Sequence, residues 1–317
     1  MTKFKQGFSL VELLVVIFII GVLASITMMN YQESQRKAQE AKVKADWIIA
    51  EGRYIEKLAG KWSFDEGSGS TTQDSTDFKN TGTLHGNPTW LAETDCISGK
   101  CLLLDGTDDY IELSTMPRTG YPFTFSGWIY MSTTGPHDGG SLFLGNGDNY
   151  DDTKNHIMVD QNAKEVNMDQ YRNSGGGTYS SLLEKGKWYY VVASFLNNNI
   201  TPTTQSDRKI YLNGYLDLYQ TGLADPYRGE DPEVNSSTWK WLIGTRLYPS
   251  NSLYYFNGRI DEFAIYDGAL SFSQIKENYI AGLENLLAKN SITKDEYNKR
   301  LAELELAELQ NDNLAKK

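Results

Sequence analysis

Residues 123–131 read FTFSGWIYM, an apolar and aromatic run that is interrupted by Thr, Ser and Gly. Similar short runs recur on both sides of it and are broken by clusters of Gly, Asn, Asp and Ser. These runs are Leu102–Leu104, Tyr110–Leu113, Trp188–Ala193 and Lys209–Leu212. The last is followed by Asn213-Gly214, a dipeptide typical of a tight β-hairpin. Repeated strands without intervening helices indicate an all-β sandwich.

The N-terminal segment has a different character. Residues 6–29 read QGFSLVELLVVIFIIGVLASITMM, preceded by Lys3 and Lys5. The apolar part runs for about 22 residues, which is long enough to span a bilayer. It contains one acid, Glu12, whose charge is costly in lipid and therefore needs a reason.

No proline occurs before Pro88, so a helix can continue well beyond this apolar run. We therefore expect a long helix over residues 8–59, with a transmembrane part at 8–29. A cleaved signal peptide, with Val22–Ala24 as its cleavage site, and an uncleaved signal anchor are the alternatives. The length of the apolar run and Glu12 argue against the signal peptide.

Lys3, Lys5, Gly7, Phe8 and Glu12 together resemble the class III leader of type IV pilins and pseudopilins. The resemblance implies that residues 1–7 are removed between Gly7 and Phe8 by a prepilin peptidase and that Phe8 becomes the N-methylated first residue. It also implies that Glu12 pairs with the terminal amine of a neighbouring subunit. Physical chemistry agrees, because a paired carboxylate near a helix N-terminus is stabilised by the partner and by the helix dipole.

The same resemblance places the protein in space and names its partners. A pilin-like chain is held by one pass through the inner, cytoplasmic membrane before assembly. It then joins other pilin subunits in an extracellular pilus or an envelope pseudopilus.

A second resemblance covers about residues 60–281. The stretches that carry it are 62–69 (WSFDEGSG), 80–86 (NTGTLHG), 104–111 (LDGTDDYI), 125–129 (FSGWI), 186–189 (GKWY) and 258–266 (GRIDEFAIY). Together they resemble the concanavalin-like laminin G jelly roll of bacterial extracellular proteins. The resemblance implies two packed antiparallel sheets and a carbohydrate or protein ligand. The tryptophans on strand patterns are expected in the core: Trp62, Trp128, Trp188 and Trp241.

Many members of that family hold a structural calcium ion, whose ligands are oxygens of Asp, Asn and backbone carbonyls. The resemblance places Asp74 and Asn80 after the opening strand and Asp261 in the closing strand, so we expect a Ca²⁺ site there. The alternative is that these residues make Asx-turns and strand-end hydrogen bonds. The acid-rich loop 148–152 lacks a regular ligand spacing and is expected to be solvated. Several tyrosines in polar stretches, Tyr254 and Tyr255 among them, suit a sugar-binding surface, but the sequence singles out no ligand contact.

Cys96 and Cys101 are the two cysteines of the chain. Beyond the membrane they meet an oxidising space, so a disulfide is expected. A two-cysteine metal site is the alternative, although it lacks nearby Cys or His partners.

The C-terminal residues return to a helical period. Ile275, Tyr279, Leu283 and Leu286 mark one helix, and a capping box, Thr293 to Glu296, opens a second. We expect a short helical hairpin, with residues 282–317 as a tail after the jelly roll.

The formal net charge is −11, so nucleic acid is an unfavourable partner. We find no metalloprotease, nucleophile-elbow or P-loop motif and expect no enzyme activity. The leading hypothesis is a type IV pilin-like filament subunit that displays a laminin G-like adhesion domain. The alternatives are a pseudopilin of a secretion or uptake system and a tethered glycan-active enzyme.

Overall fold

The computed structural model describes residues 58–114, 123–136, 140–145, 156–159, 165–169, 178–197, 205–224, 241–245 and 254–315. By its internal contacts the chain divides into two units, Met1–Ile55 and Glu56–Lys317, and all described residues belong to the second. Residues 8–57 of the predicted helix 8–59, with Gly7, Phe8 and Glu12, lie outside the described residues, as does the acid-rich loop 148–152. Of the helices in the described ranges, none combines the length and apolar character that crossing a bilayer requires.

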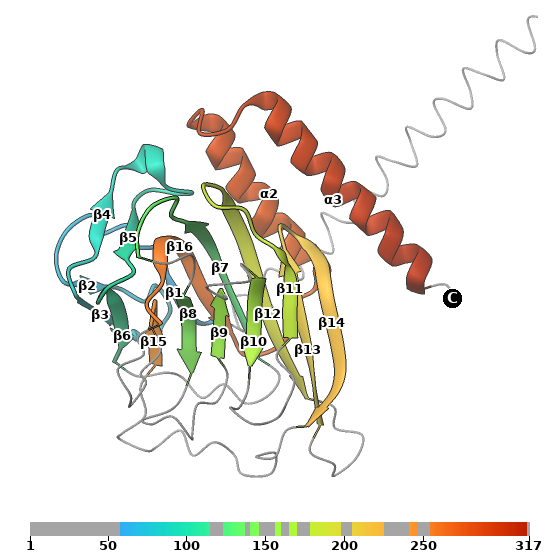
Figure 1. Cartoon of the computed structure of the whole chain (residues 1–317), viewed down its shortest axis with the longest axis horizontal. Coiled ribbons are helices and arrows are strands. Elements are labelled where there is room, and N and C mark those ends of the chain that lie inside the picture. The colour runs from blue at the N-terminus through green and yellow to red at the C-terminus, as the bar shows by residue number, and fades with distance from the viewer. Residues whose placement is uncertain are drawn as a thin grey trace, which may run out of the picture. The chain divides into compact units, whose positions relative to one another are not determined.

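Strands dominate the described part of the second unit (Figure 1). They are β1 (Leu58–Trp62), β2 (Thr71–Thr72), β3 (Gly82–His85), β4 (Thr89–Leu91), β5 (Cys101–Asp105), β6 (Tyr110–Leu113), β7 (Phe123–Met131), β8 (Gly140–Gly145), β9 (His156–Val159), β10 (Glu165–Asp169), β11 (Thr178–Leu182), β12 (Trp188–Asn197), β13 (Gln205–Leu212), β14 (Tyr215–Ala224), β15 (Trp241–Ile243) and β16 (Asn257–Tyr266). A 3₁₀ turn, η1 (Glu93–Asp95), and two α-helices, α2 (Phe272–Ala288) and α3 (Lys294–Ala315), complete them.

The strands form two antiparallel sheets that pack face to face, which confirms the predicted sandwich (Figure 1). The first has the order β14-β13-β12-β7-β16-β5-β4, and β1 also pairs with β16. The second has the order β11-β10-β9-β8-β15-β6-β3-β2. Strands close in sequence, such as β5 and β6, therefore lie in different sheets, and the turns between them line the ends of the sandwich.

Strand β7 shows why these residues form a sheet with two covered faces. Phe125 and Ile129 point inward, where Phe125 meets Phe143 of the other sheet at a centroid distance of 5.1 Å. Gly127 lies between them because a Cβ there would collide with the ring of Phe263. The alternating residues point outward, and Trp128 among them is still buried.

Helix α2 is what covers Trp128. Its Tyr279 ring stacks on Trp128 at 5.6 Å, and Gly282 lets the helix approach, since a Cβ would meet the indole. Ser271 caps the helix and forms a full capping box with Gln274. The expected apolar face is confirmed: Ile275, Tyr279, Leu283 and Leu286 are buried. The outer face of the first sheet is therefore not a solvated surface under this helix.

Helix α3 begins as the capping-box pattern indicates, with the Glu296 amide donating to Thr293 Oγ1 at 3.1 Å. Tyr297 and Leu304 are buried against the rest of the unit. The Asn213-Gly214 hairpin is also confirmed. Both residues have positive φ, +52° and +85°, as a type I′ turn requires.

Two predicted boundaries need correction. Leu58 and Ala59, assigned to the long helix, lie in β1, because Leu58 pairs with Tyr266 of the last strand. The tail was assigned from residue 282, but the predicted helix that contains Ile275 and Tyr279 begins at Phe272, within the range given to the jelly roll, and Ser271 caps it. In both cases a strand pairing or a helix cap, and not the apolar period, determines the boundary of the element.

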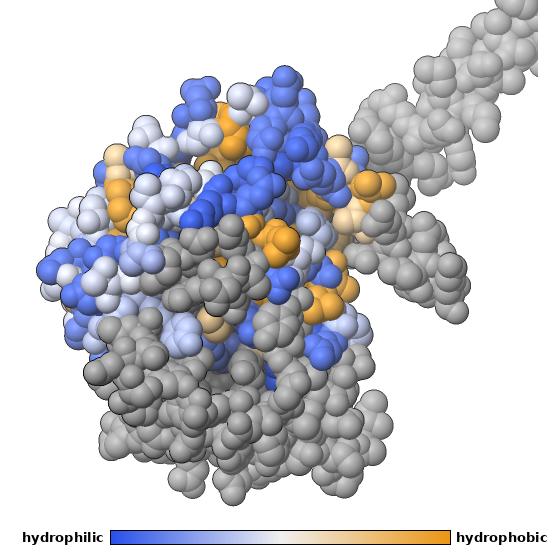
Figure 2. Space-filling model, in the orientation of Figure 1, coloured by the Kyte–Doolittle hydropathy of each residue, from blue (hydrophilic) through white to orange (hydrophobic). Residues whose placement is uncertain are grey.

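The core tryptophans behave nearly as expected. Trp62, Trp128 and Trp188 are buried, while Trp241 is half-buried and packs against the core. The described surface visible in Figure 2 is mainly hydrophilic, with apolar residues in small groups. Exposed large apolar side chains among the described residues are Phe78, Leu182, Tyr219 and Leu306.

Candidate functional site

An acidic turn joins β5 to β6 at one end of the sandwich. Asp105, Asp108 and Asp109 bring carboxylate oxygens within 4.8 Å of one another. The Thr107 amide donates to Asp105 Oδ1 at 2.7 Å, and the Asp105 amide donates to Asp109 Oδ2 at 2.9 Å. Gly86 of a neighbouring turn lies so close that a Cβ there would collide with Asp109. The backbone therefore holds the three acids together despite their charge.

Asp109 is the buried member, with 4% of its surface exposed, whereas Asp105 and Asp108 are exposed. Burial raises the pKa of Asp109 from 3.8 to about 6. The hydrogen bond from the Asp105 amide lowers this pKa, and the negative charges of Asp105 and Asp108 raise it. A cation at this turn would relieve the repulsion, and oxygen ligands suit Ca²⁺, with carbonyls and water completing its six to eight ligands.

A row of rings lies beside the acidic turn. His85 of β3 stacks on Tyr110 of β6 at 4.5 Å, because the two residues are register partners. Tyr110 in turn lies 6.3 Å from Tyr255. All three side chains are half-buried, so each keeps part of its ring open to solvent. Flat, partly exposed rings next to hydrogen-bonding carboxylates are the features with which a protein holds a sugar.

The stretch 104–111 contributes to the family resemblance, but its acids were not predicted to be ligands. The signal was available in LDGTDDYI, where three acids surround a glycine between two strands. Tyr255 was among the tyrosines considered for a sugar surface. His85 and Tyr110 were missed, because their pairing depends on the register of β3 with β6.

The predicted calcium ligands have different hydrogen-bond partners. Asp74 and Asn80 do lie together, with Asn80 Nδ2 donating to Asp74 Oδ2 at 3.0 Å. Asp74 Oδ1 also accepts from the amides of Lys61 and Thr76, both at 2.9 Å. Donors surround this carboxylate, and the Thr76 contact is the Asx-turn of the alternative interpretation.

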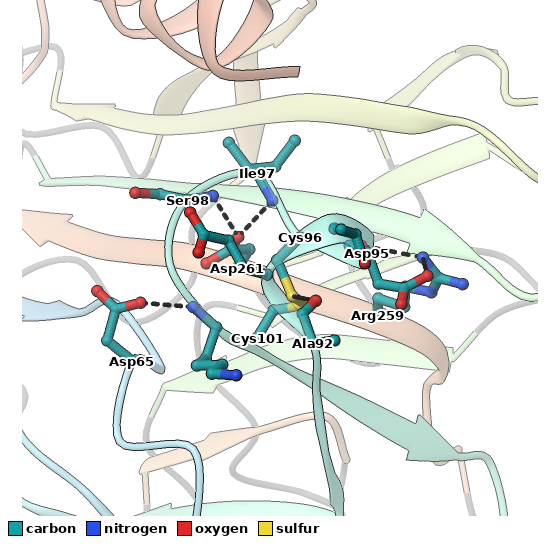
Figure 3. The surroundings of a disulfide bond; sticks show 12 residues. Asp65, Ala92, Asp95, Cys96, Ile97, Ser98, Cys101, Arg259 and Asp261 are labelled. Atoms are coloured by element: carbon teal, nitrogen blue, oxygen red, sulfur yellow. Dashed lines mark hydrogen bonds and ion pairs between the residues drawn. A yellow bond between two sulfur atoms is a disulfide. The ribbon is translucent and has the colours of Figure 1, made fainter. Parts of the chain in front are cut away.

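Asp261 binds a different segment, the loop closed by the disulfide (Figure 3). Its Oδ2 accepts from the amides of Ile97 and Ser98 at 2.7 and 3.1 Å. Burial raises the pKa of Asp261 well above its usual range. The structure therefore gives Asp74 and Asp261 separate hydrogen-bonding roles, and a shared metal site for the three residues stays a prediction.

The Cys96–Cys101 disulfide is confirmed, with Cα atoms 5.5 Å apart. It closes the loop whose amides hold Asp261 (Figure 3). So small a loop contributes about 2 kcal/mol of stability in the chain-entropy description. The bond thus fixes a turn on the edge of the first sheet.

Comparisons with known proteins agree with both halves of the chain. Residues 2–28 match the prokaryotic N-terminal methylation motif. A stretch of 48 residues is 44% identical to the type II secretion system core protein G of Klebsiella pneumoniae. That match covers 15% of this chain and 34% of the relative, so the chain spans about a third of that protein's length.

Solved structures resemble the sandwich in fold alone. One is botulinum neurotoxin type C, whose cell entry depends upon interaction with two ganglioside molecules. It is 14% identical with a TM-score of 0.51 and covers 73% of this chain and 52% of its own. The binding domain of botulinum neurotoxin serotype D is 15% identical with a TM-score of 0.50, covering 73% and 53%. The chain thus spans about half the length of these structures.

The sandwich itself matches a laminin G-type family over residues 105–276, more than half of the chain. The matched range begins at the last residue of β5, includes the acidic turn and ends in the first half of α2. The chain therefore belongs to the concanavalin A-like lectin/glucanases superfamily and carries a type IV pilin methylation motif at its N-terminus.

Proposed function

We propose that this chain is a type IV pilin-like filament subunit whose sandwich binds carbohydrate. The observation that carries the proposal is the union, in one chain, of the methylation motif with a lectin-type sandwich. In this proposal the N-terminal segment sits in the membrane before assembly and packs with other pilin subunits afterwards. The sandwich is then presented outside as an adhesive head that binds and does not catalyse.

The site proposed for the sugar is the end of the sandwich formed by the acidic turn and the ring row. His85, Tyr110 and Tyr255 offer ring faces for the apolar C–H side of a sugar. The exposed carboxylates of Asp105 and Asp108 accept hydrogen bonds from its hydroxyls. Calcium fits the same three acids and would neutralise charge there, while the protein's own residues orient the ligand.

A glycan array with the full-length chain in detergent tests this site. Tyr255→Ala should lower the signal for any bound glycan at least about tenfold, as expected for loss of a stacking ring. Tyr219→Ala removes an exposed tyrosine from β14 and should leave the signal unchanged. A glycan signal that survives Tyr255→Ala and His85→Ala would place the binding surface elsewhere. Released product from a bound glycan would instead favour a tethered enzyme.

A pseudopilin is the second candidate, favoured by the match to a type II secretion core protein. The two candidates differ in where the assembled chain lies. Electron microscopy of surface filaments with labelled protein separates them, because label along or at the tip of pili supports the pilin. Label confined to the cell envelope supports a pseudopilus.

The proposed assembly depends on Glu12 and on processing between Gly7 and Phe8. Glu12→Ala should leave membrane insertion intact and prevent incorporation into filaments, since the buried terminal amine then lacks its partner. Glu12→Asp keeps the charge and should retain part of the incorporation. A mature chain that does not begin at Phe8, as read by mass spectrometry, would contradict this part of the proposal.

A further inference from the structure

A cavity lies away from the acidic turn, where the helical hairpin meets the first sheet. It has a volume of about 290 Å³, near the lower end of small-molecule pockets. Its walls come from η1, β7, β12, β16 and both helices. The turn between α2 and α3 is fixed against η1 by Ser291 Oγ, which donates to Thr94 O at 3.1 Å, and by Lys289 Nζ, which donates to Glu93 O at 3.2 Å.

Three cations from three separate segments reach this cavity: Lys187 of the turn before β12, Arg259 of β16 and Arg300 of α3. Arg259 of β16 lies over the Tyr130 ring at 4.5 Å. Arg300 of α3 donates from Nη1 to the carbonyl of Trp188 at 3.3 Å. The Arg300 side chain is 11% exposed and that of Arg259 is 26% exposed, so both guanidinium groups are substantially desolvated.

Acids hold these cations in place, mostly from outside the cavity. Arg300 Nε pairs with Glu296 at 2.8 Å, and Lys187 pairs with the exposed Glu184. Neither glutamate lines the cavity. Asp95 does line it and pairs with Arg259 Nη1 at 3.1 Å (Figure 3). Arg259 makes both of its contacts with Asp95 through Nη1. Within the described part of the chain, Nε and Nη2 of Arg259 can therefore still donate to a ligand.

The lining therefore carries three positive charges and one negative, in a chain whose net charge is −11. Each of these cations uses only part of its N–H donors on its acid, so the cavity offers the remaining donors to an anion. Planar guanidinium groups match a carboxylate in particular, because two parallel N–H donors meet its two oxygens. Beside them Thr94, Ser291 and Asp95 offer polar groups suited to hydroxyls.

From this arrangement we infer that the cavity is a second binding site, for a carboxylate-bearing sugar of monosaccharide size, of the hexuronate type. The carboxylate meets Arg259 and Arg300, with Lys187 at the mouth, and the hydroxyls face Asp95 and the Thr94–Ser291 side. A neutral hexose lacks the charge that this lining selects, and a bare carboxylate fills only part of the volume. The site shares no lining residue with the acidic turn.

Isothermal titration of the full-length chain in detergent with glucuronate, glucose and acetate tests this inference. Glucuronate should bind at least about tenfold more tightly than either of the others, and its affinity should fall as salt is added. Arg300→Gln should weaken binding at least about tenfold, and Lys187→Gln, at an exposed position, about threefold. Lys299→Gln is the matched control, since Lys299 lies on the same helix and its side chain is 67% exposed.

Each outcome decides for or against the site. Equal binding of glucose and glucuronate, or equal losses in Lys187→Gln and Lys299→Gln, overturns it. Acetate binding as tightly as glucuronate overturns the assignment to a sugar. If Arg300→Gln does not fold, Arg259→Lys replaces it, because lysine keeps the charge without the two-pronged geometry and should still weaken binding. Tyr255→Ala, in the row of rings beside the acidic turn, should leave glucuronate binding intact, which separates failure here from failure of the proposed function.

Discussion

Asp74 and Asp109 are both nearly fully buried carboxylates of the same sandwich, with 2% and 4% of their surfaces exposed. Their surroundings differ completely. Asp74 accepts five hydrogen bonds, from Lys61 N, Thr76 N, Thr76 Oγ1, Asn80 N and Asn80 Nδ2. Asp109 has the amide of Asp105 on one oxygen and two further acids beside it.

The difference shows that burial alone does not define a functional acid. A carboxylate enclosed by N–H and O–H donors is already satisfied, and its role is to tie β1 to the turn that follows β2. The charge of Asp109 is disfavoured mainly by burial and further by two neighbouring acids, and a cation or a sugar hydroxyl can relieve this. On this ground the acidic turn is the better candidate for a ligand.

The largest effect is expected for Asp74→Ala. It leaves five donors without their acceptor in a buried place, so we expect the free energy of unfolding to fall by about 3 to 4 kcal/mol. Denaturant unfolding of the full-length chain, followed by tryptophan fluorescence, measures this. Asp77→Ala, at an exposed acid of the same turn, should change it by less than about 0.5 kcal/mol. Similar losses in both variants would remove the structural role given to Asp74.

Calcium should produce the next largest effect, at the other carboxylate. At a hundredfold excess over its dissociation constant, Ca²⁺ should stabilise the folded chain by about 2.7 kcal/mol. Thermal unfolding with and without calcium measures the shift. Asp109→Asn should abolish the shift, and Asp77→Asn should retain it. A shift that instead disappears in Asp261→Asn and persists in Asp109→Asn would restore the ligand set predicted from the sequence.

A smaller effect concerns pH in the absence of calcium. The pKa of Asp109 is about 6 in the folded chain, whereas the ordinary value of 3.8 applies to the unfolded chain. The folded state therefore holds the proton of Asp109 more tightly. The contribution of Asp109 to the free energy of unfolding is therefore fully present below about pH 4, and it is lost as the pH rises through about 6. Asp109→Asn keeps an acceptor for the Asp105 amide and cannot ionise.

We therefore expect Asp109→Asn to be more stable than the parent chain by about 1 to 2 kcal/mol at pH 7 and to match it near pH 4. Unfolding free energies measured at half-unit steps of pH give the comparison. A parent and variant with parallel profiles from pH 4 to 7 would show that the carboxylate is not strained at neutral pH.

The strands and helices of the sandwich could be predicted from local sequence patterns. The run at 123–131 became β7, and the Asn213-Gly214 pair became the hairpin between β13 and β14, because both depend on neighbouring residues alone. The apolar stripe of α2 was likewise predicted correctly, although the tail was assigned to begin only at residue 282. Cys96 and Cys101 could be paired in advance because so few alternatives existed.

The candidate sites were much harder to predict from the sequence. Asp261 was predicted to share a metal site with Asp74, and its contacts with the amides of the disulfide loop depend on the pairing of β16 with its neighbours. The ring row depends on the register that sets His85 opposite Tyr110. No local pattern distinguishes Asp109, which is buried, from Asp108, which is exposed.

The sequence by itself determined the two identities of the chain, a pilin-type leader and a lectin-type sandwich, because both are written in contiguous motifs and in strand periods. Only the tertiary structure decided which charges meet. Arg259 and Arg300 are separated by a strand end, a helix and a turn, yet they line one cavity. Contacts of this kind follow from sheet order and helix packing, which act over distances that no local pattern encodes.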